Sequence, residues 1–334
     1  MQPSRPEPAA VPPDDFTQIV NAWREGRIVL TAVELDLFSA IGDGATAAEI
    51  ARRLAADPRG AGCLLHALAA LGLLEKRAES FHNGPVAARF LCAGAPDDRR
   101  GALLHSAALW HRWSALTECV RTGRPADRGP RDEADTAAFI AAMHANSTQR
   151  APALVAALEL SGVRRVLDVG GGSGGYAIAL ARALPQARIE VLDLADVVPL
   201  TACYVAAAGV AARVRTRVGD LNADDFGAGY DLVLISAICH MNGPAQNGDL
   251  IRRAAHALAA GGRLAVLDHI LDPDRTAPLA GAIFAVNMLV NTEAGGNYTE
   301  AEYFGWMRDA GLADVARIPI PDPAGLVVGT RPWN

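Results

Sequence analysis

Two aspartates and a run of glycines have the types and spacing of a small-ligand site. Residues 170–175 hold five glycines, Asp168 stands two residues before Gly170, and Asp193 follows Gly174 by 19 residues. Glycine loses the most backbone freedom on folding, so a glycine run indicates a close approach or a sharp turn. A carboxylate at Asp168 would repel a pyrophosphate, but it suits an ammonium, directly or through water. Asp193 is placed to accept both hydroxyls of a ribose.

Two ligands match parts of this pattern. Gly170, Gly172 and Gly175 fit the G-x-G-x-x-G spacing of dinucleotide-binding proteins, which would indicate a nicotinamide cofactor. A ribose and an ammonium without a phosphate describe S-adenosylmethionine, which the two acids favour. A glycine-rich turn that binds no ligand is the third interpretation.

The segments around the glycines predict the elements that must position them. Residues 166–169 are a short apolar run typical of a buried strand, and residues 176–184 are apolar at helical spacing up to Pro185. Residues 188–194 read as a second strand. Strand, glycine loop, helix and strand form a Rossmann-type unit, which places a ligand against the loop and the helix N-terminus.

Three further strands are predicted, in residues 213–221, in residues 230–240 and at the end of residues 249–271. The helix that begins the last of these segments is expected to end at Gly261 and Gly262, since glycine is common just after a helix.

The C-terminal residues 316–333 read as two strands joined by a turn at Asp322 and Pro323. A hairpin that completes an otherwise parallel sheet is typical of class I methyltransferases and unusual in dehydrogenases. The predicted fold class is therefore α/β, with a parallel sheet whose last strand is antiparallel.

An earlier part of the chain reads as a winged helix. Thr46 and Glu49 form a predicted capping box, Asp57 caps a second helix, and residues 73–84 read as a two-stranded wing. Winged helices often bind DNA, and a DNA-reading helix needs several side chains that reach bases and phosphates.

The second helix offers only Arg59 and His66 as polar side chains that could contact DNA. Its apolar surface instead favours packing against another helix, such as one from a second subunit.

The composition narrows the class of protein. The chain has 334 residues, 51% of them hydrophobic, and a net charge of −6, which does not favour a nucleic-acid surface. Five scattered cysteines without a C-x-x-C pair indicate reduced thiols, a cytoplasmic location and no zinc site. No apolar run reaches the roughly 18 residues of a membrane span. Residues 1–15, Pro-rich and polar, are expected to be a disordered tail without a signal peptide.

Residues 99–158 read as mostly helical and lead directly into the Rossmann-type unit. Phe139, Met143 and Ser147 lie four residues apart and so share a helix face. This face either contributes to the ligand pocket or forms an apolar seam between domains.

The motifs, taken in order, resemble those of the S-adenosylmethionine-dependent small-molecule O-methyltransferases, which include plant caffeate, bacterial polyketide and acetylserotonin-type enzymes. The resemblance implies a winged-helix dimerisation and lid domain over residues 16–158, a catalytic domain over residues 159–334, and a homodimer that acts on a small molecule. The matching motifs are "VLTAVELDLFSAI", "LDVGGGSGG", "VLDLADVV", "VGDLN", "LISAICHMN", "AAGGRLAVLD" and "NMLVNTEAGGNYTEAEY".

The resemblance also implies roles for single residues. His240 falls at the position of the family's catalytic base, Asp268 where a glutamate usually supports that base, and Asn297 where a second glutamate is usual. The chain reads His240-Met241-Asn242 where the family commonly has His-Asp-Trp. The expected cofactor-binding residues are Asp168, Gly170, Gly172, Gly174, Asp193, Leu194, Gly219, Asp220, Leu221 and Ser236. The expected acceptor-binding residues are Phe139, Met143, Phe284, Met288, Asn291 and Asn297.

The expected chemistry is transfer of a methyl group to a hydroxyl group. An imidazole and a phenol ordinarily differ by roughly 3.5 in pKa, so full proton transfer between them costs about 5 kcal/mol. Concerted removal of the proton avoids that full cost, which favours a phenol, an enol or a carboxylic acid over an aliphatic alcohol. Methylation of carbon, a relative that has lost methyl transfer, and a winged-helix regulator that senses S-adenosylmethionine remain as alternatives.

Overall fold

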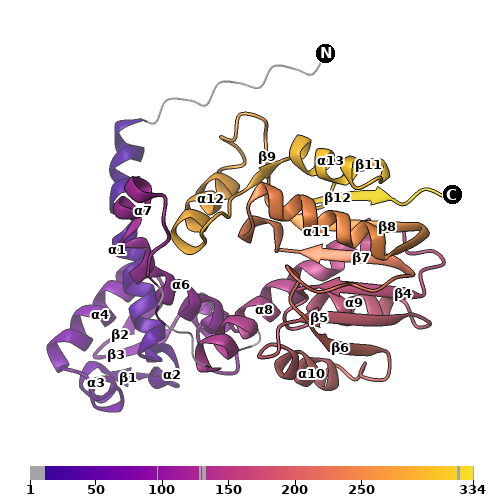
Figure 1. The fold of residues 1–334 in the computed structure, drawn as a ribbon. Helices are drawn as coiled ribbons and strands as arrows, with labels where there is room; N and C mark the ends of the chain where they lie inside the picture. The colour runs from indigo at the N-terminus through magenta and orange to yellow at the C-terminus, as the bar shows by residue number, and fades with distance from the viewer. Residues whose placement is uncertain (1–11, 96, 128, 130–132, 322–323, 334) are drawn as a thin grey trace. The chain divides into compact units, whose positions relative to one another are not determined.

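The computed structural model describes residues 12–95, 97–127, 129, 133–321 and 324–333 (Figure 1). The turn expected at Asp322 and Pro323 and the first 11 residues of the expected tail lie outside this part of the chain. The chain divides into two compact units, Met1–Ala108 and Leu109–Asn334. Residues 109–158, which the sequence grouped with the first domain, therefore belong by their contacts to the second unit.

The N-terminal unit combines helices with a small antiparallel sheet of strand order β1-β3-β2. Its core is built from side chains such as Phe38, Ile50, Leu65 and Phe81. The predicted helix-turn-helix and wing are confirmed, with the capping box at Thr46 in place. The elements are α1 (Pro13–Glu34), α2 (Leu37–Ile41), β1 (Ala45–Thr46), α3 (Ala47–Arg53), α4 (Pro58–Ala70), β2 (Leu74–Arg77), β3 (Ser80–Asn83) and α5 (Pro85–Phe90).

The second unit is built on a seven-stranded sheet of order β11-β12-β8-β7-β4-β5-β6. The neighbours from β8 to β6 pair in parallel, while β12 runs antiparallel to both β8 and β11, so the predicted C-terminal hairpin is confirmed. The strands are β4 (Arg165–Val169), β5 (Arg188–Asp193), β6 (Val214–Val218), β7 (Tyr230–Ser236), β8 (Leu258–Asp268), β11 (Ala313–Ile318) and β12 (Gly325–Thr330).

Two apolar clusters bury the sheet. One joins β7 and β8 to side chains such as Leu250 and Tyr303, and the other joins β4 and β5 to side chains such as Leu154 and Leu180. The remaining elements are α6 (Arg100–Trp113), which spans the boundary between the units, α7 (Leu116–Thr122), α8 (Glu133–Ala157), α9 (Gly175–Ala183), α10 (Val198–Ala207), a 3₁₀ turn (Cys239–Met241), α11 (Pro244–Ala257), β9 (Ile270–Leu271), α12 (Leu279–Asn291), β10 (Tyr298–Thr299) and α13 (Glu300–Asp309).

One predicted boundary is wrong. Helix α11 ends at Ala257, and Gly261 and Gly262 lie inside β8 rather than at the end of the helix. The Gly261 N–H donates to the carbonyl of Arg331, and the Arg331 N–H donates to the carbonyl of Gly262. Gly261 has a φ of 74°, so the glycine pair forms an irregularity in the strand, where the pairing of β7 with β8 shifts register.

The strand order creates a topological switch point. The chain builds β4, β5 and β6 outward in one direction and then returns to place β7 on the other side of β4. Open α/β sheets bind ligands at the carboxyl ends of the strands beside such a point.

Among the described residues, no helix combines the length and apolar character needed to cross a bilayer.

Candidate active site

The glycine loop after β4 meets two separate backbone demands. Gly170, Gly172 and Gly174 have φ values of 66°, 56° and 75°, a left-handed conformation that other residues rarely adopt. Gly171 has an ordinary φ, but a side chain there would begin 2.7 Å from the carboxyl group of Asp168. The glycines therefore permit both the turn and the burial of an acid beneath it.

Asp168 is a buried acid, and in the described part of the chain neither of its carboxylate oxygens has a hydrogen-bond partner. Burial, together with the nearby carboxylate of Asp193, raises its pKa to about 7. The ionised form of a buried carboxyl group raises the free energy of the folded protein unless an opposite charge compensates it. The site thus fits the ammonium group of a ligand such as S-adenosylmethionine.

Asp193 joins the glycine loop to the end of β5. Its carboxylate accepts the N–H of Gly172 at 2.7 Å and that of Leu194 at 2.8 Å, and its carbonyl accepts the N–H of Gly219 at 2.9 Å. Burial raises the pKa of Asp193. A carboxylate has about four acceptor positions, so two remain for the hydroxyls of a ribose.

The other predicted cofactor residues border the same loop. A side chain at Gly170 would begin 2.6 Å from Ile238 and 3.4 Å from Leu221, so these two apolar residues flank the loop. Ser236 is buried at the end of β7, whereas Leu194 and Asp220 are exposed. Leu194 and Leu221 thus offer apolar surface of the kind that a nucleobase packs against.

Helix α8 contacts the glycine loop through three residues that share one helix face. Ile140 lies beside Gly172, His144 bonds Ser173 at 2.9 Å, and a side chain at Gly175 would overlap the hydroxyl group of Ser147. Sequence reasoning missed Ile140 and His144, although their spacing to Ser147 was a usable signal. The predicted residues Phe139 and Met143 occupy the positions just before them and are half-buried.

His240 and Asp268 meet at the ends of two adjacent strands. His240 Nδ1 lies 2.7 Å from Asp268 Oδ1, and the backbone N–H of His240 donates to Oδ2 of the same carboxylate at 3.2 Å. Burial acts to raise the pKa of Asp268, yet contact with His240 holds it below its ordinary value. Asp268 is therefore ionised and holds the imidazole in one orientation.

The histidine is also fixed through its main chain and its ring face. Its carbonyl accepts the N–H of Gly296 at 2.9 Å, and a side chain at Gly295 would collide with that carbonyl. The edge of the Phe284 ring meets the imidazole at a centroid distance of 4.9 Å. Phe284 of α12 thus places an apolar ring against the imidazole.

Two family profiles match the chain: an O-methyltransferase dimerisation domain over residues 17–93 and an O-methyltransferase domain over residues 114–313. The chain belongs to the O-methyltransferase family. It is 37% identical to the 3-hydroxy-5-methyl-1-naphthoate 3-O-methyltransferase of Streptomyces sahachiroi over 97% of both chains. It is 33% identical to the tetracenomycin polyketide synthesis 8-O-methyltransferase TcmO of Streptomyces glaucescens, over 96% of this chain and 97% of that enzyme.

A solved structure of PigF with SAH is 26% identical to this O-methyltransferase and superimposes with a TM-score of 0.89, over 96% of this chain and 100% of PigF. The predicted family, fold class, enzyme class and cofactor are confirmed: the protein is an S-adenosylmethionine-dependent O-methyltransferase. Methylation of carbon and a regulatory role are not favoured.

The predicted acceptor residues of the O-methyltransferase lie along α12 beyond Phe284. Met288 and Asn291 are buried on successive turns of the helix. Arg112 donates to the Asn291 side-chain oxygen at 2.9 Å, and the Trp113 indole donates to that of Asn287 at 2.9 Å. Polar groups from the end of α6 thus meet the C-terminal part of α12, and no motif of the sequence had indicated Arg112.

Asn297 is buried in the O-methyltransferase, but its amide group bonds the backbone of α12 and not His240. Its Nδ2 donates to the carbonyl of Gly281, and its buried Oδ1 has no hydrogen-bond partner within the residues that the structure describes. Among the described residues it makes no hydrogen bond to His240, so Asp268 is the residue whose side chain bonds the imidazole. No set of three or more His, Cys, Asp or Glu side chains in the described part of the chain is arranged to hold a metal ion.

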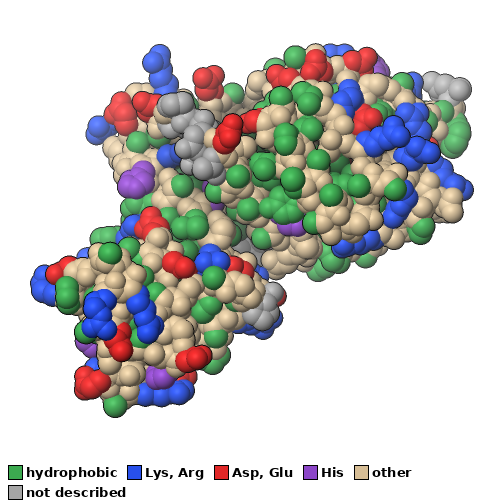
Figure 2. Space-filling view, turned by 90° about the horizontal axis from the view of Figure 1, so that it is seen from below, with side chains coloured by type: hydrophobic (Ala, Val, Ile, Leu, Met, Phe, Trp, Pro, Cys, Tyr) green, Lys and Arg blue, Asp and Glu red, His purple; other side chains and the backbone are tan. Residues whose placement is uncertain are grey.

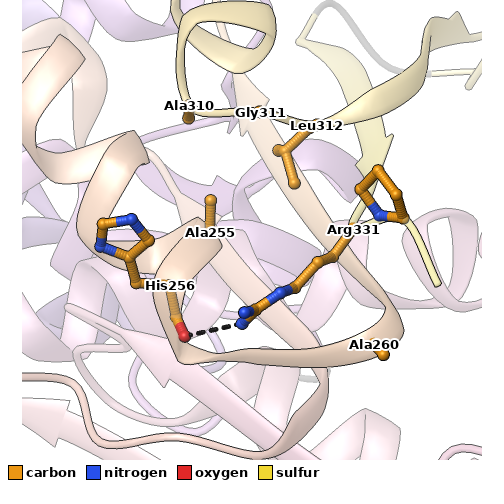
Figure 3. Close-up of a pocket in the computed structure, with 8 residues that line it drawn as sticks. Ala255, His256, Ala260, Ala310, Gly311, Leu312 and Arg331 are labelled. Carbon is orange, nitrogen blue, oxygen red and sulfur yellow. Dashed lines mark hydrogen bonds between the residues drawn. The ribbon is translucent and has the colours of Figure 1, made fainter. Parts of the chain in front are cut away.

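A surface pocket of the O-methyltransferase lies away from these residues (Figure 3). It is lined by residues such as His256, Leu312 and Arg331, near the start of β8 and thus at the opposite end of the sheet from His240. Arg331 already donates to the carbonyl of His256 at 3.0 Å. This pocket contains none of the predicted site residues.

Proposed function

We propose that His240 is the general base that removes the proton of an acceptor hydroxyl while the hydroxyl oxygen gains a methyl group. The observation that carries the proposal is the buried contact of His240 Nδ1 with Asp268. An ionised carboxylate can only accept a hydrogen bond, so Nδ1 carries the proton of a neutral ring and Nε2 keeps the lone pair that a base needs.

The cofactor-binding residues hold the second reactant. Asp168 compensates the charge of an ammonium group, and Asp193 accepts the hydroxyls of a ribose. Leu194 and Leu221 give apolar contact to the adenine ring. When bound, S-adenosylmethionine supplies a methyl group already activated by its sulfonium. The protein must then hold the acceptor oxygen in line and take up its proton, since correct orientation alone removes a large part of such a barrier.

The acceptor that suits this site is an aromatic or polyketide-like molecule with a phenolic or enolic hydroxyl. Phe284 presents an apolar ring beside His240, and Met288 is buried one turn further along α12. Phe139 and Met143 of α8 add further apolar side chains. The names of the two bacterial relatives describe methylation of a hydroxynaphthoate and a step of tetracenomycin polyketide synthesis, which supports an aromatic acceptor here.

We further propose a cytoplasmic homodimer that joins through the N-terminal unit and does not bind nucleic acid. Helix α1 exposes an apolar stripe of Phe16, Ile19, Val20 and Trp23, whose exposed fractions are 62%, 65%, 52% and 53%. These residues lie at i, i+3, i+4 and i+7 and so form one face. In Figure 2, acidic and basic side chains are interspersed over the visible face of the N-terminal unit, which does not favour a phosphate backbone.

The deciding experiment combines methyl-labelled S-adenosylmethionine with a panel of phenols, naphthols and polycyclic enols, and identifies labelled products by mass spectrometry. We expect the label on an aromatic oxygen. Label on carbon, or no transfer to any member of the panel despite cofactor binding, would contradict the proposed acceptor class.

A further inference from the structure

We propose that His144 is a positioning residue that holds the glycine loop in its cofactor-binding shape through the hydroxyl group of Ser173. The inference rests on the assignment of this loop as the cofactor site. It concerns a residue of α8 that no motif of the sequence singled out.

The contact is made at the centre of the loop. His144 Nδ1 lies 2.9 Å from Ser173 Oγ, and Ser173 is the one residue between Gly170 and Gly175 that has a side chain. Ser173 is buried, and its neighbours Gly172 and Gly174 both have positive φ. Ser173 therefore carries the only side chain of residues 170–175, and the surrounding protein can otherwise bond this stretch only through its backbone.

A second helix holds the same stretch from α10. The Thr201 hydroxyl donates to the carbonyl of Gly172 at 2.5 Å. One turn later, the Tyr204 ring stacks on the His144 imidazole, with centroids 4.0 Å apart and an interplanar angle of 23°. Helices α8 and α10 are thus joined to each other and to the loop through His144.

Such anchoring has a function because glycine-rich backbone is costly to order. A loop ordered before binding does not lose that entropy when the ligand arrives, so the ligand binds more tightly. Burial lowers the pKa of His144, which keeps the ring neutral at pH 7 and leaves one ring nitrogen able to accept a hydrogen bond. A neutral ring also adds no positive charge to the loop that is proposed to receive an ammonium group.

The test compares variants that separate the hydrogen bond from the stacking. His144→Phe keeps an aromatic ring against Tyr204 but loses the bond, whereas His144→Asn keeps a polar atom near the position of Nδ1. Ser173→Ala removes the other partner. His256→Phe, an exposed histidine at the opposite end of the sheet, is the matched control.

The readouts are calorimetric affinity for S-adenosylhomocysteine and amide hydrogen exchange of residues 170–175 in the ligand-free protein. Loss of one buried hydrogen bond corresponds to about a tenfold change in affinity. We expect His144→Phe and Ser173→Ala each to weaken binding about tenfold and to speed exchange, and the double variant to be no weaker than either single variant. His144→Asn is expected to stay within about threefold of wild type, and the control is expected to be unchanged.

Additive losses in the double variant, or a His144→Phe protein that binds within about twofold of wild type, would overturn the inference. If the His144 variants do not fold, as judged by circular dichroism, Ser173→Ala alone decides through its affinity and exchange. Failure of the wild-type protein to bind S-adenosylhomocysteine would overturn both the cofactor assignment and this inference. Wild-type binding with unaffected variants would overturn only the role of His144.

Discussion

Oδ1 of Asp268 lies 2.7 Å from Nδ1 of His240 and also accepts the backbone N–H of His269 at 2.7 Å. With the His240 N–H on Oδ2, one buried carboxylate gathers three donors from two strand ends. Such a carboxylate cannot rotate without losing several bonds, so it fixes the ring that it holds. The chemistry proposed for His240 thus depends on an acid that fixes the orientation of its imidazole.

Replacing the base tests the proposed mechanism directly. We expect His240→Ala to lower the rate of methyl transfer by about 10² to 10⁴, the usual scale of general base catalysis. Affinity for S-adenosylhomocysteine should change by less than about twofold, because the residues proposed to hold its ribose and ammonium groups are Asp193 and Asp168. Single-turnover rates and calorimetry measure the two effects separately. Turnover within about threefold of wild type between pH 6 and 9 would mean that proximity alone drives the transfer.

Replacing the orienting acid should have a smaller effect. Asp268→Asn keeps an oxygen that can accept the Nδ1–H of His240 but loses the negative charge that stabilises the imidazolium. We expect the rate of methyl transfer to fall by about 10- to 100-fold, less than for His240→Ala. The double variant should be no slower than His240→Ala, because the acid acts only through the histidine. An additive loss in the double variant would show that Asp268 has a separate role.

The parts of the fold that follow from local signals could be predicted from the sequence. The capping box at Thr46, the strand before Asp168 and the C-terminal hairpin each depend on residues close together in the chain. The end of α11 could not be predicted in this way, because Gly261 and Gly262 pair with Arg331, about seventy residues later. A glycine pair looks the same in sequence whether it ends a helix or distorts a strand.

In the site, too, residues that follow from local sequence signals differ from residues that depend on contacts between distant parts of the chain. Asp168, Asp193, His240 and Asp268 stand at strand ends, where the parallel order of the sheet brings them together. His144 and Thr201 reach the glycine loop only because α8 and α10 pack against it. Spacing to Ser147 can place His144 on the same helix face, but no spacing along the chain identifies Ser173 and Gly172 as the partners of His144 and Thr201.

The apolar face of α1 predicts how the oligomer can be broken. We expect the double variant Phe16→Glu and Ile19→Glu to convert the proposed dimer into a monomer, since four buried charges across a two-fold interface would lose their hydration. Light scattering at micromolar concentration measures the mass. Glu25→Gln, an exposed change on another face of the same helix, is the matched control and should leave the mass unchanged. A wild-type protein that is already monomeric would contradict the proposal.

Asp168 should make the ligand-free protein less stable as the pH rises. Its pKa is about 7 in the folded state and ordinarily 3.8, so the folded state binds the proton more tightly. The resulting loss of unfolding free energy begins near the ordinary pKa, grows up to about pH 7 and has an upper limit of roughly 4 kcal/mol. We therefore expect Asp168→Asn to raise the free energy of unfolding at pH 8, with a smaller gain at pH 5. Urea denaturation without ligand measures this, and equal gains at both pH values would contradict it.

The same carboxylate should make cofactor binding depend on pH in the opposite sense. An ammonium is compensated only by the ionised form, so below about pH 7 Asp168 must release its proton before the ligand binds. We expect the affinity for S-adenosylhomocysteine to fall by up to about tenfold per pH unit below pH 7. Asp193, the nearby acid, is unchanged in Asp168→Asn, so the difference between the two proteins isolates Asp168. That variant should bind more than about tenfold more weakly at pH 8 and lose most of the pH dependence. A wild-type affinity that is constant from pH 5.5 to 8 would rule out Asp168 as the ammonium site.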